Sequence, residues 1–451
     1  MTLYSLMLMA MAVYVPEQLH FPTSFGVKGL NTYNLMLLLL VLGLAFRKDL
    51  SAEEGYLPSM RPPVARQMYF LFATILLGLA IALARRDGNV IADITVAKNH
   101  ISYMLLFLVY FYAVRDIRLA RWIFFATMFV AILAGVEAIR EGLAYGVGAH
   151  FNEMKRASGP FGENFRDANR AGVFYAMYLP VFVAALLLLK GKKWLRLAAL
   201  GGALILVFGI FFTYSRQAIA IAAIMLALLI LRRSALWTVI VIVAALNYEV
   251  WVPAAVIDRF SETTQTTEYG EEVLDQSTES RFVIWSGAMT LIKEHPFGIG
   301  LARFPKDIEH VVGFSKDAHN SYILVTTELG IQGGIALLLV MFACLALGRR
   351  IRKKAVTEED RFVGVGYTVL TVSMMLGNIY GSPFFTGNVM GNFWILTALA
   401  ARYYQWMGVR EKNAAASERA SAHTHQEQER PWGVPAWQWN RRSERAVDSR
   451  G

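Results

Sequence analysis

The chain has 451 residues, of which 56% are hydrophobic and only 17% are charged. A soluble globular domain carries about 25% charged residues, so this composition excludes an ordinary soluble enzyme. The formal charge of +10 does not indicate nucleic acid as a partner, because the basic residues cluster at the ends of hydrophobic segments and no basic-aromatic surface motif appears. The single cysteine, Cys344, excludes an intramolecular disulfide and a cysteine-based metal site.

The hydrophobic residues come in blocks of roughly 17–25, the length that crosses a bilayer as a helix, and the alternating pattern of a membrane barrel is missing. We therefore predict an all-α polytopic membrane protein with about twelve transmembrane helices and a long loop outside the membrane that contains helices. The expected spans lie near residues 2–18, 29–46, 67–86, 97–114, 121–140, 168–189, 197–214, 217–231, 235–252, 320–348, 362–380 and 389–405. The first of them lacks a basic start and a clear cleavage site, so it is expected to be retained.

The lysines and arginines of the short loops indicate the orientation. They gather in five loops that alternate with the others, near 47–66, 115–121, 190–196, 232–233 and 349–361. We place this side, and both termini, in the cytoplasm, with the membrane spanned by residues 1–405. The long loops at about 141–167 and 253–319 then lie on the opposite face of the membrane, and the polar segment 406–451 is expected to be a disordered cytoplasmic tail.

Several arginines fall on the opposite, non-cytoplasmic side, where the positive-inside rule does not explain them. They are Arg85, Arg86, Arg156, Arg166, Arg170, Arg216 and Arg281. We expect an anionic substrate to be the reason for their position.

The loop from 156 to 170 leads into the span that begins near Ala168. Its glycines and its proline mark turns, and Asp167 or Asn169 can cap the helix, whose free amides attract phosphate. Arg156 and Asn169 are therefore candidate substrate-binding residues. A solvated loop with ordinary helix capping is the alternative.

The stretch Phe212-Thr-Tyr-Ser-Arg216 joins two closely spaced spans. A guanidinium at the edge of hydrocarbon is costly unless it is paired or reaches the interface, and reaching the interface is the simpler explanation here. Arginine also suits a phosphate, because its planar fork donates two parallel hydrogen bonds. Ser215 and Arg216 are accordingly candidates for contact with an anionic group.

A helix is expected from about residue 277 to Pro296, which ends it. Its apolar residues recur at helical spacing and make one face apolar: Phe282, Trp285, Met289 and Ile292. This pattern predicts a helix at the membrane surface with Arg281 in its first turn. The glycine-containing turn from Pro296 to Phe304 follows, and its glycines are too sparse for a phosphate loop.

The segment that begins with His319 and Asn320 enters a strongly apolar span. Histidine is the side chain whose unperturbed pKa lies closest to neutral, which favours a chemical role for His319, although interfacial capping is an alternative. Glu328 falls inside the same span and should face a partner or a wet cavity. Gly330 and the glycines after it permit close helix approach.

Together these motifs resemble the O-antigen ligase and O-antigen polymerase superfamily of bacterial envelope proteins. The resemblance rests on Thr213-Tyr-Ser-Arg216, on Arg281 through Trp285 leading to Pro296-Phe-Gly-Ile-Gly300, and on His319-Asn320 with Glu328-Leu-Gly330. It implies a C-type glycosyltransferase-like membrane fold in the bacterial inner membrane, with the long loop at about 253–319 in the periplasm. Such a protein transfers a glycan from an undecaprenyl-diphosphate carrier to a lipid or protein acceptor at the periplasmic face. It also implies that no cofactor or metal is needed.

The resemblance predicts His319, Arg216 and Arg281 as catalytic residues. His319 would accept the proton of the acceptor hydroxyl or contact the diphosphate as a cation, and the arginines would bind the diphosphate. Ser215 and Asn320, with Arg156, Asn169 and Glu328, are expected to contact substrate or to orient His319. The ligase reading competes with a polysaccharide polymerase and a protein O-glycosylation ligase. A lipid or polysaccharide transporter is disfavoured because no internal repeat is visible.

Overall fold

The computed structural model describes residues 2–14, 31–46, 62–146, 152, 154–162, 167–231, 239, 242–243, 246–261, 264–266, 272–274 and 276–428. These residues form helices apart from one antiparallel hairpin, in which β1 (Thr264–Thr266) pairs with β2 (Glu272–Leu274). The α-helices are α1 (Leu3–Tyr14), α2 (Thr32–Ala45), α3 (Ala65–Arg85), α4 (Val90–Ala113), α5 (Ile117–Ala144), α6 (Ala168–Leu188), α7 (Lys193–Thr213), α8 (Arg216–Ile230), α10 (Tyr248–Trp251), α11 (Ala254–Ser261), α12 (Gln276–Glu294), α13 (Phe304–Val312), α14 (Ser321–Lys353), α15 (Glu358–Gly377) and α16 (Gly387–Gln428). Two short 3₁₀ turns are η1 (Gly159–Phe161) and η3 (Pro383–Phe385).

Six of the described helices are long and apolar enough to cross a membrane, namely α3, α4, α5, α6, α7 and α14. The helices α1, α2 and α8 are apolar but shorter. The prediction of a helical, multi-pass membrane protein is therefore confirmed. The count of about twelve spans stays a prediction, because α15 and α16 do not meet the same criteria and most of the expected span at 235–252 lies outside the described residues.

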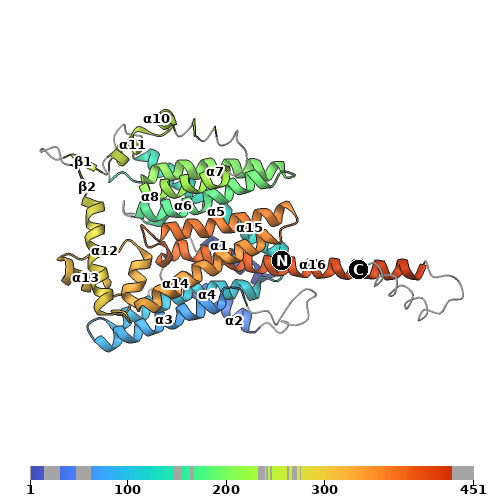
Figure 1. The fold of residues 1–451 in the computed structure, drawn as a ribbon, viewed down its shortest axis with the longest axis horizontal. Coiled ribbons are helices and arrows are strands. Elements are labelled where there is room, and N and C mark those ends of the chain that lie inside the picture. Colours follow the sequence, from blue (N-terminus) through green and yellow to red (C-terminus); the bar gives the residue numbers. More distant parts are fainter. Residues whose placement is uncertain are drawn as a thin grey trace, which may run out of the picture. The chain divides into compact units, whose positions relative to one another are not determined.

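Helix α6 is the most deeply buried of the six long apolar helices and packs against α7, α8 and α15 (Figure 1). Its tyrosines Tyr175 and Tyr178 are fully buried. Gly172 lets α8 approach closely, since a Cβ there would lie 2.8 Å from the Cβ of Ala218. This close approach holds the start of α8, where Arg216 stands, against the first turns of α6.

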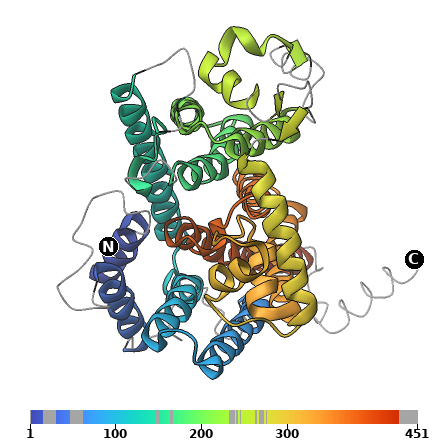
Figure 2. The same cartoon turned by 90° about the vertical axis from the view of Figure 1, so that its left-hand side faces the viewer.

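The two ends of the bundle differ in their polar contacts. At one end α12 runs across the ends of the other helices rather than along them (Figures 1 and 2). At the opposite end Arg121 and Lys192 pair with Glu359, and the amide of Gly191 donates to Glu358. The helix ends that carry the candidate arginines and His319 thus share the end that α12 crosses.

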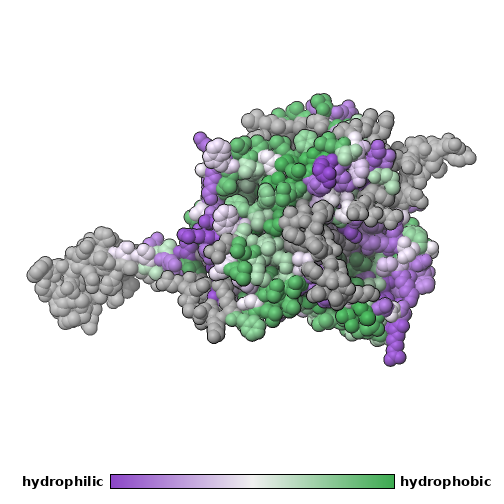
Figure 3. Space-filling view, turned by 180° about the vertical axis from the view of Figure 1, so that it is seen from behind, coloured by the Kyte–Doolittle hydropathy of each residue, from purple (hydrophilic) through white to green (hydrophobic). Residues whose placement is uncertain are grey.

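Apolar side chains cover the middle of the bundle surface. Figure 3 shows hydrophobic residues gathered across the centre of one face, with hydrophilic residues towards the ends. Large exposed hydrophobic side chains on the spanning helices include Leu76, Trp122 and Phe129. Such a band is what a helix bundle presents to lipid.

Helix α14 is broken at Gly330, whose φ is 78° and whose ψ is 178°. The break leaves backbone amides and carbonyls without the hydrogen bonds of a continuous helix. The turn before α13 supplies hydrogen-bond partners for them. The amides of Ile299 and Gly300 donate to the carbonyls of Thr327 and Glu328, each at 3.0 Å. On the far side of the break, the amide of Ile331 donates to the carbonyl of Pro296 at 2.9 Å.

The same turn is also bound to α3. The amide of Leu301 donates to the carbonyl of Gly78 at 3.0 Å, and a Cβ on Gly300 would lie 2.9 Å from the amide nitrogen of Ala82. The turn Pro296–Phe304 therefore serves as backbone packing between α3 and α14. This explains why glycine occurs at positions 298 and 300, which both have a φ near 100°.

The C-terminal segment differs from the prediction of a disordered tail, because α16 continues to Gln428. Residues 406–428 are rich in alanine, glutamate, glutamine and arginine, which are strong helix formers, so helix propensity explains the continuation. The described residues from 403 to 428 belong to a compact unit separate from the rest of the described chain. Residues 429–451 lie outside the described residues.

We expect Gly330→Ala to lower the free energy of unfolding by at least about 1–3 kcal/mol, because its backbone conformation is suited to glycine. A Cβ there would also lie 2.4 Å from the carbonyl carbon of Phe297. Gly201→Ala in α7 is the matched control, since nothing lies within 4 Å of its Cβ position, and it should be neutral or stabilising by up to about 1 kcal/mol. Denaturant unfolding in detergent measures both variants, and equal stabilities would contradict this account of the break.

Candidate functional site

Helix α12 is fixed across the bundle end by its own small hydrophobic cluster. Ile284, Ala288 and Leu291 are buried against Phe304 and Ile308 of α13. Phe282 and Met289, which belong to the apolar face identified in the sequence, lie outside this cluster and are about half exposed. The cluster takes up smaller side chains of α12, and Trp285 packs against it. An apolar outer face is compatible with the predicted position at the membrane surface.

The first turns of α12 bind the loop that carries His319. The indole Nε1 of Trp285 donates to the carbonyl of Ala318 at 2.8 Å. The rings of Trp285 and Tyr380 meet edge to face with centroids 5.6 Å apart, and the guanidinium carbon of Arg281 lies 5.0 Å from the centroid of the Tyr380 ring. Residues from three separate segments therefore meet around His319.

His319 itself stands in a left-handed backbone conformation, with a φ of 48°, which is uncommon for a residue with a side chain. Next to it, the Asn320 side chain accepts a hydrogen bond from the amide of Ile323 at 3.1 Å and caps α14. The cap accounts for Asn320 without a substrate, and it leaves the imidazole of His319 about one-third exposed at the mouth of the helix.

The charges around His319 act on its protonation. Partial burial lowers the pKa of His319, and the positive charges of Arg281 and Lys316 lower it further, against the opposing effect of the Asp317 carboxylate. The Nδ1 atom lies 3.9 Å from an oxygen of Asp317. A lowered pKa keeps the imidazole neutral at neutral pH, the form in which it can accept a proton.

The segment 377–382, which joins α15 to η3, lies beside this loop, and sequence reasoning did not select it. The amide of Ser321 donates to the carbonyls of Asn378 and Gly381, at 2.9 and 3.1 Å. The hydroxyl of Ser321 donates to the side-chain oxygen of Asn378 at 2.7 Å. A run of asparagine, tyrosine, glycine, serine and proline between two apolar blocks is a turn signal, and it is the clue that could have identified this segment.

The same segment reaches the start of α8. The side-chain nitrogen of Gln217 donates to the carbonyl of Gly377 at 2.6 Å, and its oxygen lies 3.2 Å from the Cβ position of Gly381. Gln217 follows Arg216 directly, and Ser215 caps α8 by accepting from the amide of Ala218. The segment 377–382 therefore connects the Arg216 region with the His319 region.

Arg156 and Asn169 lie behind the Arg216 region and bind each other. The Arg156 guanidinium is buried and donates to the side-chain oxygen of Asn169 at 2.6 Å and to the carbonyl of Thr213 at 2.9 Å. The neighbouring amide of Ala157 donates to the carbonyl of Phe212. These contacts anchor the loop that holds Ser215, so protein partners account for the positions of both polar side chains.

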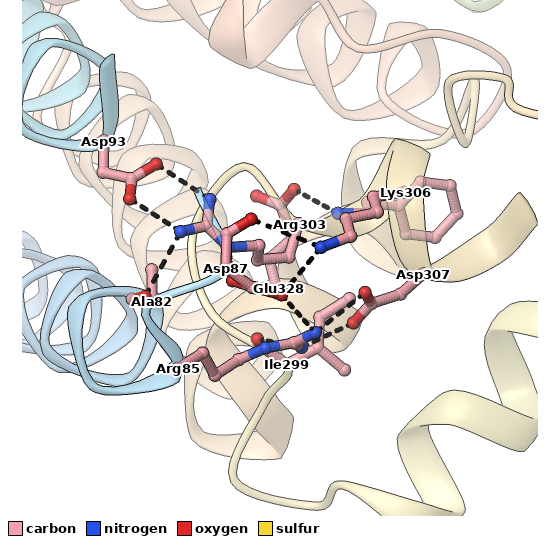
Figure 4. A network of polar contacts seen from close by, with 10 residues as sticks. Ala82, Arg85, Asp87, Asp93, Ile299, Arg303, Lys306, Asp307 and Glu328 are labelled. Atoms are coloured by element: carbon pink, nitrogen blue, oxygen red, sulfur yellow. Dashed lines mark hydrogen bonds and ion pairs between the residues drawn. The ribbon is translucent and has the colours of Figure 1, made fainter. Parts of the chain in front are cut away.

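Glu328 is not part of the group around His319. Its carboxylate accepts a hydrogen bond from the amide of Phe304 at 3.1 Å, at the start of α13 (Figure 4). The carboxylate thereby caps the start of α13. This agrees with the expectation that Glu328 faces a partner inside the span. The partner is the backbone of the turn before α13.

A network of ion pairs explains two basic residues without a substrate (Figure 4). Arg303 donates to both oxygens of Asp93 at 2.8 and 2.6 Å, and both side chains are buried. Arg85 donates to both oxygens of Asp307, at 2.6 and 2.9 Å. The expectation that Arg85 awaits an anionic substrate is therefore wrong, because a carboxylate far away in the sequence neutralises it.

Asp87 joins the two halves of this network. Burial acts to raise the pKa of Asp87, but hydrogen bonds from Arg303, Lys306 and Arg85 outweigh it and lower that pKa to about 2. The pKa of Arg303 is raised, first by its hydrogen bonds to Asp93. Among the other arginines named from the sequence, Arg170 pairs with Asp167 at 2.8 Å, and Arg166 lies outside the described residues.

Comparison with known proteins bears on the central part of the chain. Residues 201–338 match the family model of O-antigen ligases, which confirms over that stretch the resemblance that the motifs indicated. The matched stretch contains Arg216, Arg281 and His319, whereas Arg156 and Asn169 precede it and the segment 377–382 follows it. No curated protein matches the chain.

We expect Arg303→Met to lower the free energy of unfolding by about 3–5 kcal/mol, because it leaves the buried carboxylate of Asp93 without its partner. The double variant Arg303→Met with Asp93→Asn should recover part of this loss. Arg170→Met is the control, since that ion pair is exposed and is worth about 0–1 kcal/mol. Chemical unfolding in detergent measures all three, and equal losses for the two single variants would contradict the structural role of Arg303.

Proposed function

We propose that this chain transfers a glycan from undecaprenyl diphosphate to an acceptor hydroxyl at the periplasmic face of the bacterial inner membrane. One observation carries the proposal. A half-buried histidine with a lowered pKa stands beside Arg281 at a helix mouth, and one segment connects it with the Arg216 region. The match of this part of the chain to O-antigen ligases supports the same reading.

The proposed reaction is a direct displacement at the anomeric carbon. The acceptor oxygen forms a bond to that carbon while the bond from the carbon to the diphosphate oxygen breaks, with inversion. His319 takes the proton of the acceptor hydroxyl as general base. Arg216 and Arg281 bind the diphosphate and stabilise the negative charge that it carries away.

The other predicted residues take supporting roles in this proposal. Ser215 and Asn320 cap α8 and α14 and so hold Arg216 and His319 in place. Arg156 and Asn169 secure the loop behind Ser215. Glu328 positions α13 through its backbone and acts at a distance from the reacting atoms. The proposal needs no metal or cofactor.

The proposed topology keeps about twelve spans, with α15, the first part of α16 and the region 235–252 added to the apolar helices. Two observations support it. The candidate residues share the bundle end that α12 crosses, and the Glu358–Glu359 contacts with basic loops lie at the other. The first end would face the periplasm and the second the cytoplasm.

We expect His319→Ala to reduce transfer by about 10²–10⁴-fold and Arg216→Ala by about 10²–10³-fold, with normal insertion in the membrane. Arg170→Ala, an exposed arginine of the same bundle end, should keep nearly full activity. The assay uses purified protein with an undecaprenyl-diphosphate-linked glycan and lipid A-core, followed by gel and mass spectrometry. Glycan on the core identifies a ligase, and longer chains on the carrier identify a polymerase. Full activity of well-expressed His319→Ala would end the assignment.

The pH profile separates the two possible roles of His319. As a general base it must be neutral, so kcat/KM should fall as the pH drops through a pKa below 6.5. Lys316→Met removes a positive charge that lowers this pKa, so the acid limb should move to higher pH, whereas Lys293→Met should leave it in place. Activity that rises as the pH falls would show that His319 acts as a cation on the diphosphate.

A further inference from the structure

A pocket of about 510 Å³ lies at the other end of α12, away from Arg281 and His319. The end of α3, the last turn of α12, the turn before α13 and α13 itself all contribute to it. Its lining includes Ile81, Arg85, Leu291, Glu294, Ile299 and His310. Figure 4 shows Arg85, Ile299 and Asp307 of this lining, which come from separate segments of the chain. The volume is in the range of small-molecule sites, about 300–1,000 Å³.

The lining combines an apolar floor with unused polar groups. Leu291 and Ile299 are buried beneath the pocket. Glu294, His295 and His310 are exposed on its rim, and no side-chain hydrogen bond or ion pair joins them to the described part of the chain. These side chains offer both hydrogen-bond donors and acceptors.

The charges of the pocket restrict the ligand. Arg85 and Asp307 neutralise each other through two hydrogen bonds, and Glu294 adds a carboxylate. An anionic group bound here would be repelled by the Glu294 carboxylate, and the Arg85 guanidinium that could attract it is already paired with Asp307. An uncharged sugar suits the lining, because its hydroxyls both donate and accept hydrogen bonds and its ring presents an apolar face.

The position of the pocket relates it to the proposed reaction. Arg281 and Leu291 stand ten residues apart on α12, which at 1.5 Å per residue is about 15 Å along one rigid helix. A group held at the pocket is therefore too distant to be the sugar that reacts. The pocket is at a distance that a sugar further along the same oligosaccharide could reach.

We infer that this pocket is a second saccharide subsite, which binds uncharged sugars about 15 Å along α12 from Arg281. The inference rests on the proposed function for the nature of the ligand. The sugars belong either to the donor glycan or to the acceptor core, since both have the same chemistry. The subsite would favour long substrates without taking part in the reaction.

The test compares Glu294→Gln and His310→Gln with Glu309→Gln, an exposed residue of α13 that does not line the pocket. Transfer is measured with donors of one sugar and of several repeats, and with truncated and full acceptor cores. We expect each pocket variant to raise the KM for the long substrate by about tenfold, equivalent to about 1.4 kcal/mol. The KM for the short substrate and the kcat values should stay unchanged.

The two arms separate the sources of the sugar. Dependence on donor length assigns the subsite to the donor glycan, and dependence on core length assigns it to the acceptor. Equal effects on long and short substrates in both arms would overturn the inference.

A direct binding experiment keeps the inference apart from the proposed function. Saturation-transfer NMR with the lipid-free glycan should give a signal for wild type and Glu309→Gln and a weaker one for the pocket variants. A wild-type protein that transfers no glycan would refute the proposed function. The difference in NMR signal between wild type and the pocket variants would still test whether the pocket binds sugar. Equal signals from all variants would refute the subsite.

Discussion

The backbone pairing between the broken helix α14 and the turn Pro296–Phe304 is the constraint on which the candidate site depends. A helix broken inside a bilayer leaves peptide groups that lipid cannot satisfy. Here the amides and carbonyls of the turn take those groups up on both sides of Gly330. The same turn follows the end of α12 and leads into α13. The hydrogen bonds to the broken helix therefore also fix α12 across the bundle end, where Trp285 contacts the loop of His319.

Electrostatics divides the basic residues of that end into two kinds. Arg85 and Arg303 are bound to carboxylates of the chain, and their role is to join α3 and α4 to the region of α13. Arg281 instead lies over an aromatic ring next to a titratable histidine, where its charge helps to lower the histidine pKa. All three arginines belong to the same end of the bundle, and the ion pairs of Arg85 and Arg303 are what identify these two as structural.

The segment 377–382 gives the site its connection between distant parts of the sequence. Through Ser321 it holds the first turn of α14, through Tyr380 it contacts α12, and through Gly377 it contacts α8. The segment therefore ties the ends of α8, α12 and α14 together. In the proposed reaction this arrangement would keep the base and the diphosphate-binding arginines in register, as orientation of reacting groups requires.

The sequence by itself determined the membrane class, the approximate bounds of most long helices and the motifs around Arg216, Arg281 and His319, because hydrophobic length and local turn chemistry are properties of contiguous residues. Only the tertiary structure decided that Arg85 is neutralised by Asp307, that Glu328 caps α13, and that Gly377–Ser382 joins the site. It also decided which face of α12 is buried. Each of these depends on partners that are far apart along the chain, and a hydrogen bond or an ion pair forms only where the fold brings its two partners within about 3 Å of each other.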